Sequence, residues 1–327
     1  MLKLYLDWNV ITTLRQIDEL TNPLDKETFN KLAHILIAGR EKLILPYSNA
    51  HLKDLSKSYK KGERKRVTES LNFISLLTQD ICLTQYWNEE KAKWHYRNPK
   101  TFFESLIKDV ETTNSLYGLK ESLAELGLSN VFDSFKLLPH NIDFQQLEQN
   151  KVFSLIFKRA KLENSLYALM EDITELFGEL RNNPVVYNEL RSMFTTVFPL
   201  DPKIHNVPNV VERLRDKISK TMINESFKGL KENTNKTSKN EDYTKIIGTF
   251  MQLDFAGYGT DKLTEKNQYD NLFNDSLHCF YGAHCDFFIT ADKKTYKKTK
   301  AVYQSEGILT QVMKPSEFVE LLENTNS

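Results

Sequence analysis

The sequence predicts a three-layer α/β/α fold with a central parallel sheet, interrupted by a helical insertion. Strand-sized apolar runs alternate with helical patterns near both ends of the chain, whereas the middle shows helical periodicity alone. Near the start, LKLYL (2–6) and KLILP (42–46) are strand-sized and flank a helical pattern over 24–39. A strand, a helix and a strand in this order predict a right-handed crossover between parallel strands.

The middle of the chain, residues 101–244, is predicted to be a helical insertion. Its residues 144–181 show one long amphipathic pattern, which ends just before Pro184, and a further helix is expected to begin near Pro208. The segment 228–245 is polar and lysine-rich and has almost nothing to bury. Such a composition predicts a flexible loop.

The α/β pattern returns in residues 245–327, so residues 1–100 and 245–327 are predicted to form one domain around the insertion. The elements expected in this last part are, in order, helices over 242–255 and 270–284, strands over 286–290 and 308–313, and a helix that opens after Pro315 with Ser316 as its cap.

The composition is that of an ordinary soluble protein. Of the 327 residues, 40% are hydrophobic and 27% are charged, with 44 lysines and arginines against 44 aspartates and glutamates. A net charge of zero means that any binding of nucleic acid must depend on a local patch. The three cysteines predict reduced thiols, and no apolar run approaches the length of a membrane span. We therefore expect a cytoplasmic protein without membrane contact.

Two aspartates lie just beyond predicted strands. Asp7 follows the strand in LYLDWNV directly, and Asp292 comes two residues after Thr290, the last residue of the strand in FFITADKK. Ligands of a parallel sheet bind beyond the carboxyl ends of its strands, so both are candidate metal ligands. The alternative is that each aspartate only caps the helix that follows it.

Two further aspartates lie on predicted helices. Asp275 is on the helix that leads into the strand before Asp292, and 17 residues allow that helix and strand to bring the two acids together. Asp54 lies nearly two turns into the helix after the second strand. A helix cap near Asp275 and a solvated surface position for Asp54 are the alternatives.

Carboxylates gathered at one edge of a sheet repel one another, and divalent cations relieve that repulsion. A set of oxygen ligands is suited to Mg²⁺ or Mn²⁺, which activate water and stabilise charge on a phosphate. A zinc site built from His278, Cys279, His284 and Cys285 is a weaker hypothesis, because on one helix these side chains point in different directions.

The order of these motifs resembles the PIN-domain nucleases. Asp7-Trp8-Asn9 is similar to the family's first-strand motif, and Thr290-Ala291-Asp292 to its fourth-strand motif. Asp54 and Asp275 match its two helical acids, although the family usually has glutamate at the position of Asp54. The similarity covers roughly residues 1–80 and 245–327.

The resemblance implies a metal-dependent endoribonuclease that uses Mg²⁺ or Mn²⁺ and hydrolyses RNA to a 5′-phosphate and a 3′-hydroxyl. It implies that Asp7, Asp54, Asp275 and Asp292 are catalytic, that Asp7, Asp275 and Asp292 bind metal, and that Asn9 and Thr290 support Asp7. His278, one helical turn after Asp275, is a further supporting candidate, with His51 beside Asp54 a weaker one. Lys293 and Lys294 are candidates for contacting the substrate.

Several alternatives stay open at this point. The same metal chemistry serves a nuclease that cleaves DNA, and a pocket that has lost activity would leave a non-catalytic interaction protein. A haloacid-type phosphatase requires a second aspartate where Asn9 stands. The biological roles compatible with the residues are a toxin, an RNA-processing enzyme and an antiviral defence nuclease against phage. The insertion is a candidate surface for a homo-oligomer or a protein partner.

Overall fold

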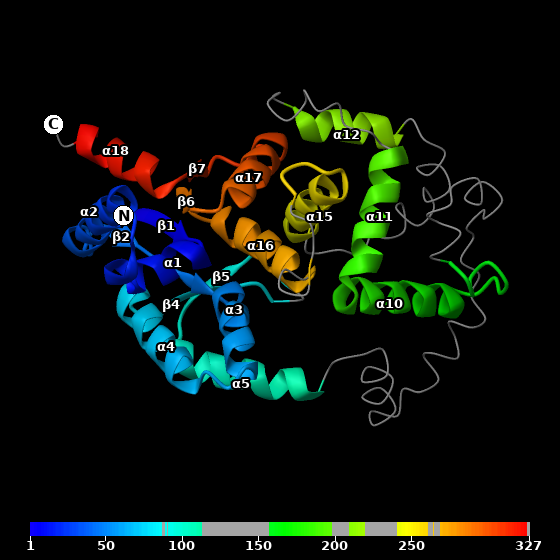
Figure 1. Ribbon diagram of the computed structural model, residues 1–327, viewed down its shortest axis with the longest axis horizontal. Helices are drawn as coiled ribbons and strands as arrows, with labels where there is room; N and C mark the ends of the chain where they lie inside the picture. Colours follow the sequence, from blue (N-terminus) through cyan, green and yellow to red (C-terminus); the bar gives the residue numbers. More distant parts are fainter. Residues whose placement is uncertain are drawn as a thin grey trace. The chain divides into compact units, whose positions relative to one another are not determined.

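The computed structural model describes the chain in two compact units (Figure 1). The first contains Met1–Ser105, Lys239–Asp254 and Asn271–Ser327, and the second contains Leu106–Ser238 and Phe255–Asp270. The segment Phe255–Asp270 therefore groups with the second unit, whereas the sequence division placed it with the terminal parts. Within the units the structure describes residues 1–86, 89, 91–112, 157–197, 209–219, 241–260, 264 and 269–325.

The first unit is an α/β structure with a parallel four-stranded sheet, as predicted. Its strand order is β2-β1-β6-β7, and each neighbouring pair is parallel. β1 pairs with β6 over three residues, Leu4 with Phe287, Tyr5 with Phe288 and Leu6 with Ile289. The strands are β1 (Leu2–Leu6), β2 (Leu43–Ile44), β6 (Phe287–Ile289) and β7 (Gln311–Met313).

A second, three-stranded sheet of this unit has the order β3-β4-β5. β3 (Tyr47–Ser48) is parallel to β4 (Ile81–Thr84), which is antiparallel to β5 (Lys93–Tyr96). The sequence indicated one continuous strand over 42–46 and no strand at β4 or β5. The chain is interrupted at Pro46, because proline has no N–H to donate to a ladder, and it then passes to the second sheet.

Four described helices of the first unit, α1, α2, α3 and α17, begin at a side-chain cap. Ser48 accepts a hydrogen bond from the N–H of Ala50, and Asn22 from that of Leu24, directly before Pro23. The predicted cap Ser316 is wrong, since Pro315 is already helical and Ser316 lies inside the helix. The helices are α1 (Trp8–Arg15), α2 (Pro23–Ala38), α3 (Asn49–Lys60), α4 (Arg64–Thr78), α5 (Pro99–Thr112), α15 (Glu241–Phe255), α16 (Tyr269–Gly282), α17 (Lys293–Ser305) and α18 (Pro315–Thr325), with a short 3₁₀ turn, η1 (Ile17–Glu19).

The core of the first unit lies around β1 and β6. Leu4, Tyr5, Phe288 and Ile289 are fully buried, as expected for parallel strands covered on both faces. Full burial of a large apolar side chain stabilises a fold by roughly 1.5–3 kcal/mol. Phe318 of α18 packs at 5.4 Å against Phe287, so the closing helix is held against the sheet by aromatic contact. This rigid base fixes where the strand ends lie.

The described part of the second unit contains α10 (Leu166–Asn182), α11 (Pro184–Val197) and α12 (Val210–Ser219). The helix predicted over 144–181 ends where expected but begins only at Leu166, because Ser165 caps it through the N–H of Ala168. Residues 144–156 of that prediction lie outside the described residues, as do residues 228–240 of the predicted loop. The rest of that loop, from Glu241, is helical. The helix expected near Pro208 is α12.

Among the helices of the described residues, none combines the length and the apolar character needed to cross a membrane.

Candidate active site

The ends of β1 and β6 are joined by hydrogen bonds between the two motifs that follow them. The N–H of Asp7 donates to the carbonyl of Ile289 at 2.9 Å. The Asp7 carboxylate accepts from the hydroxyl of Thr290 and from the side-chain amide of Asn9, each at 2.6 Å. Asn9 in turn accepts from the N–H of Ala291 at 2.9 Å. Asn9 and Thr290 therefore hold the Asp7 carboxylate by hydrogen bonds, which is one of the arrangements that the resemblance implied; a contact of Asn9 with phosphate stays a prediction.

Asp7 is buried, with 3% of its surface exposed. Burial raises its pKa, although the charge of His278 and the hydrogen bond from Thr290 act in the opposite direction. The carboxylate of Asp54 adds to the rise. Asp7 also caps α1 through the N–H of Trp8 at 2.7 Å. The helix-cap interpretation is thus correct, and the same carboxylate also faces other charged groups.

His278 of α16 lies between two of the predicted acids. Its Nε2 donates to Asp54 Oδ2 at 3.1 Å, and its Nδ1 lies 3.9 Å from Asp7 Oδ1. Nδ1 is also hydrogen-bonded to the hydroxyl of Tyr5, at 2.9 Å. Burial lowers the pKa of this imidazole, but Asp54 and Asp7 outweigh that effect, and the pKa is raised overall. His278 thereby links residues from β1, α3 and α16.

Asp54 sits in an ionic environment, since Lys57 binds its Oδ1 at 2.9 Å while His278 holds its Oδ2. Burial alone raises the pKa of Asp54, but His278 and Lys57 together lower it below its usual value. The side chain is 14% exposed. Asp54 is therefore not a solvated surface acid, which was the alternative interpretation of its sequence position.

Asp275 lies one turn before His278. Of the three clustered acids, it is the one whose negative charge is least stabilised by neighbouring groups. Burial and the charges of Asp7 and Asp54 raise its pKa to about 8, against opposing effects of Lys298 and His278. Within the described residues, no hydrogen bond or ion pair reaches its carboxyl group. Three of the four predicted acids therefore influence one another electrostatically in this structure.

Asp292 is placed differently. It is exposed and caps α17, its Oδ1 accepting from the N–H groups of Lys294 at 2.9 Å and Thr295 at 2.6 Å. Its backbone stays close to the site, because its own N–H donates to Thr290 at 3.1 Å. The carboxylate of Asp292 is not among the main causes of the pKa shifts of Asp7 and Asp275. The cap interpretation accounts for Asp292 here.

His51 has a structural role. Its Nδ1 accepts from the N–H of Ser48 at 3.0 Å, and its Nε2 therefore donates to the carbonyl of Leu6 at 2.8 Å. These bonds complete a capping box at α3 and define one neutral tautomer. Burial, together with the charge of His278, lowers the pKa of His51 to about 3. It links the end of β1 to the start of α3 without carrying charge.

The structure adds participants that the sequence analysis did not select. Asn274 is buried and donates to the carbonyl of Ala50 at 3.0 Å, one turn before the bond between His278 and Asp54. Two successive turns of α16 are thus hydrogen-bonded to two successive turns of α3. The spacing of four residues between Asn274 and His278 was a usable signal for one polar helix face. Tyr5 gave no signal, because a tyrosine within an apolar strand is indistinguishable from core.

Two sets of lysines belong to α17. Lys293 and Lys294 lie in its first turn, where Lys293 is exposed, and their contact with a substrate stays a prediction. Lys298 is buried, forms an ion pair with Asp254 of α15 at 3.0 Å, and lowers the pKa of Asp275. The ammonium group of Lys298 thus partly offsets the negative charge of the carboxylate cluster.

The donors of this site fit a divalent cation in kind. They are carboxylate oxygens. Burial, and next to it the charges of Asp7 and Asp54, disfavour an ionised carboxylate at Asp275, a cost that a bound cation would offset. The side chains do not form a ready-made metal site. In the part of the chain that the structure describes, no three aspartate, glutamate, histidine or cysteine side chains are arranged to hold a metal ion. The zinc hypothesis gains no support either, since Cys279 and Cys285 are buried thiols.

Comparison with known proteins returned no matching family model, no matching curated protein and no matching solved structure. The functional assignment therefore depends on the site itself. That site consists of Asp7, Asp54 and Asp275 around the imidazole of His278, at the carboxyl end of the central strand β1.

Proposed function

We propose that this chain is a PIN-like metal-dependent nuclease that hydrolyses phosphodiester bonds of RNA. The observation that carries the proposal is the mutual electrostatic influence of Asp7, Asp54 and Asp275, which come from three elements and share His278 as a neighbour. A buried group whose pKa is perturbed by neighbouring charges is typical of a functional site. Acids that only cap helices do not need to lie together.

The topology supports the same proposal. Asp-x-Asn follows the central strand β1, and Thr-x-Asp follows its neighbour β6 in a parallel sheet. Ligands of such sheets bind beyond the carboxyl ends of the strands. The three-layer arrangement of a PIN-like domain is part of this proposal, together with Mg²⁺ or Mn²⁺ as the cation.

Asp7 and Asp275 are the carboxylates that would hold the cation. When bound, a divalent cation activates water and stabilises the charge that develops on a phosphate under attack. Asn9 and Thr290 keep Asp7 in one orientation through hydrogen bonds of 2.6 Å each. This fixed carboxylate is the preorganised part of the site, because its rotamer is set before any ligand arrives.

His278 and Lys57 both bind the carboxylate of Asp54. Both neutralise Asp54, which would otherwise add a third charge to the buried cluster. His278 holds a proton at Nε2 against Asp54, so the imidazole is positioned to give or accept a proton at the edge of the site. Because His278 contacts the carboxylates and is itself buried, its main role is to position them.

Cleavage of single-stranded RNA by the purified protein, with and without Mn²⁺, tests the proposal. Asp7→Asn and Asp275→Asn are expected to lose at least about 100-fold in rate, because each removes a ligand charge that the transition state requires. Asp25→Asn, an exposed acid in the first turn of α2, is the matched control and should cleave normally. Cleavage by both site variants at the wild-type rate would refute the assignment.

The variant Asp292→Asn distinguishes a role of Asp292 as metal ligand from its role as helix cap. Asparagine caps a helix as well as aspartate does, so α17 should stay folded in this variant. Loss of cleavage would show that Asp292 also contributes charge to the reaction, whereas normal cleavage would leave it as the cap alone. A parallel assay with DNA of the same sequence reports whether the 2′-hydroxyl is required.

A further inference from the structure

The corner between α3 and α4 concentrates positive charge in a neutral protein. From Lys53 to Arg66 there are seven lysines and arginines but only two acids, whereas the whole chain has 44 of each sign. We define the α3–α4 corner by its five cations, Lys60, Lys61, Arg64, Lys65 and Arg66. All five are exposed.

Three of these cations have no acidic partner in the part of the chain that the structure describes. Arg66 lies 3.4 Å from Glu63, and Lys65 lies 3.9 Å from Glu69. Within the described residues Lys60, Lys61 and Arg64 form no ion pair. Arg64 is held in place by the ring of Tyr59, with its guanidinium carbon 3.3 Å from the ring centroid.

Helix stability does not account for this charge. The N-terminus of a helix favours acids, because the helix dipole is positive there. The first turn of α4 nevertheless carries Arg64, Lys65 and Arg66 and no acid, and its N-cap Glu63 makes no side-chain capping bond. The turn itself is tight, since Gly62 has a φ of 82°, a conformation that side chains other than glycine rarely adopt. The fold thus holds cations close together where they weaken α4.

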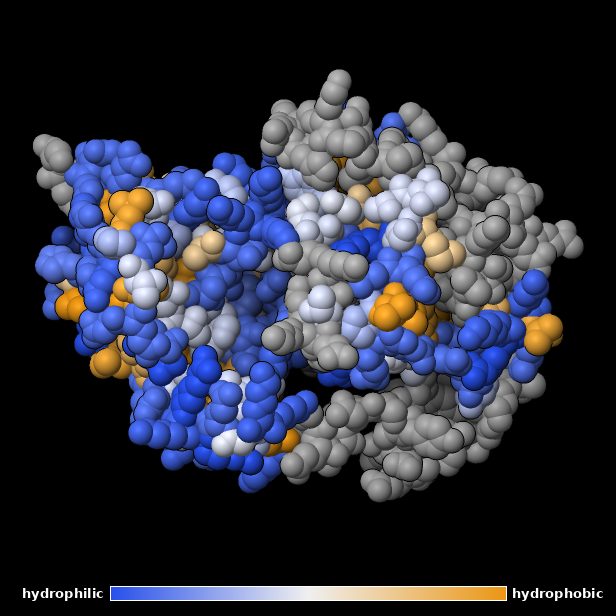
Figure 2. Space-filling view, viewed as in Figure 1, coloured by the Kyte–Doolittle hydropathy of each residue, from blue (hydrophilic) through white to orange (hydrophobic). Residues whose placement is uncertain are grey.

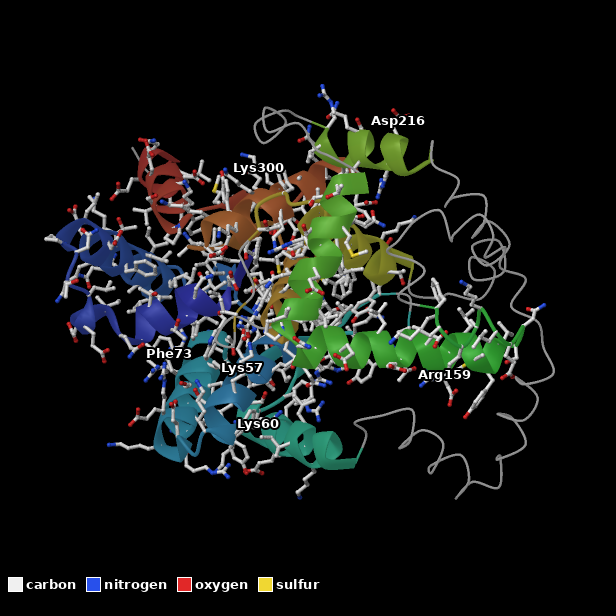
Figure 3. The ribbon with its side chains drawn as sticks, turned by 45° about the vertical axis from the view of Figure 1, so that its right-hand side comes forward. Lys57, Lys60, Phe73, Arg159, Asp216 and Lys300 are labelled. Atoms are coloured by element: carbon white, nitrogen blue, oxygen red, sulfur yellow. The ribbon has the colours of Figure 1, made fainter. Side chains whose placement is uncertain are left out.

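The corner is continuous with the candidate active site. α3 carries Asp54 in the site and then Lys57 and Lys60 at successive turns toward the corner. Figure 3 labels these two lysines on α3. At 1.5 Å per residue, Asp54 and Lys60 are separated along the helix axis by about 9 Å. Figure 2 shows that the surface over this region is strongly hydrophilic.

We propose that the α3–α4 corner binds the phosphate backbone of single-stranded RNA and leads it along α3 to Asp54. The proposal rests on the proposed nuclease function for its substrate and deepens it by assigning the path. The unpaired cations fall within five residues of sequence. So short a footprint fits a few phosphates of one strand rather than the two backbones of a duplex, which lie on either side of a major groove about 12 Å wide.

Fluorescence anisotropy with a fluorescein-labelled oligouridylate, in EDTA so that the RNA stays intact, tests the corner. The triple variant Lys60→Gln/Lys61→Gln/Arg64→Gln should bind at least about tenfold more weakly than wild type at ~0.1 M salt. The slope of log affinity against log salt should become shallower by about 2, since each lost phosphate contact contributes roughly 0.7 on a single strand. Circular dichroism verifies that the variant is folded.

The matched control is Lys26→Gln/Arg40→Gln/Lys42→Gln, which removes three positive charges on and after α2. It should keep wild-type affinity and slope. The proposal is overturned if the corner variant binds like wild type, if the control loses as much, or if an RNA duplex binds as tightly as the single strand.

Failure of the corner and failure of the nuclease function are distinguishable. Asp7→Asn should bind the oligouridylate in EDTA with wild-type affinity even though it does not cleave. If no variant or wild-type preparation cleaves RNA but the corner variant still loses binding, the nuclease proposal fails and the corner stands. If cleavage is confirmed and corner binding is unchanged, the path along α3 is wrong.

Discussion

His278 Nε2 lies 3.1 Å from Asp54 Oδ2, and the two residues are 224 positions apart in the chain. Their bond joins α16 to α3 next to Asp7, so one imidazole from the C-terminal part of the chain is shared by two acids of the N-terminal part. Because His278 is 1% exposed, this proton bridge is shielded from water. The relationship makes His278 the residue on which the charge balance of the site depends.

Replacing His278 with alanine should destabilise the protein by about 3 kcal/mol, because Asp54 and Asp7 lose a buried partner. Urea unfolding followed by circular dichroism measures the change. His34→Ala, an exposed histidine of α2, is the control and should change the unfolding free energy by less than about 0.5 kcal/mol. Equal stability of His278→Ala and wild type would show that the bridge carries no net energy.

Stability should fall as the pH rises through the range set by Asp275. Its folded pKa is about 8, above the ordinary aspartate value of 3.8, so the folded state binds the extra proton between these limits. The neutral carboxyl is favoured in the fold, and the stability associated with it is lost as pH rises toward 8. Without divalent cations, Asp275→Asn should remove most of this decline and be about 2 kcal/mol more stable at pH 8. Urea unfolding at a series of pH values measures the change. If the unfolding free energies of wild type and Asp275→Asn fall in parallel with pH, Asp275 is not the cause of the decline.

Manganese should reverse that loss in the wild-type protein. A cation that binds only the folded state stabilises it by about 1.4 kcal/mol at ten times its dissociation constant. We therefore expect Mn²⁺ to raise the melting temperature at pH 8 and to have little effect on Asp275→Asn. Calorimetric scans with and without Mn²⁺, and with Ca²⁺ for comparison, measure this. An equal shift in both proteins would place the cation elsewhere.

Thr290→Val tests the orientation of Asp7. Valine keeps the shape of threonine but cannot donate the 2.6 Å bond to the carboxylate. Losing such a supporting bond typically lowers activity or metal affinity by about 10–100-fold. Thr68→Val, on the exposed face of α4, provides the control. If RNA cleavage by Thr290→Val matches that of the control, Asp7 does not depend on this hydroxyl.

The sequence was sufficient for elements with strong periodicity. Strands β1 and β6 are largely apolar runs with buried residues. Helix α2 has a side-chain cap and a proline at its start. β5 was missed because its residues Lys93–Tyr96 are mostly exposed and lack an apolar alternation. Its partner β4 is only four residues long.

The site was predictable in its members but not in their roles. A carboxylate after a strand serves as cap or as ligand at the same backbone position, and only the fold shows that Asp7 faces other charges while Asp292 caps α17. The roles of Tyr5 and Lys57 depend on side chains brought together across the chain. Periodicity reports which face of an element is buried but not what that face meets.

Because β1 pairs with β6 and Asp275 comes from α16, a ribosome that has made the first 200 residues has not yet supplied half of the site. At roughly 5–20 residues per second, more than ten seconds separate the synthesis of Asp54 from that of Asp275. A nascent chain therefore has no assembled acid cluster until α16 has been synthesised. On the proposed nuclease function, the chain acquires its active site only in the last stage of its synthesis.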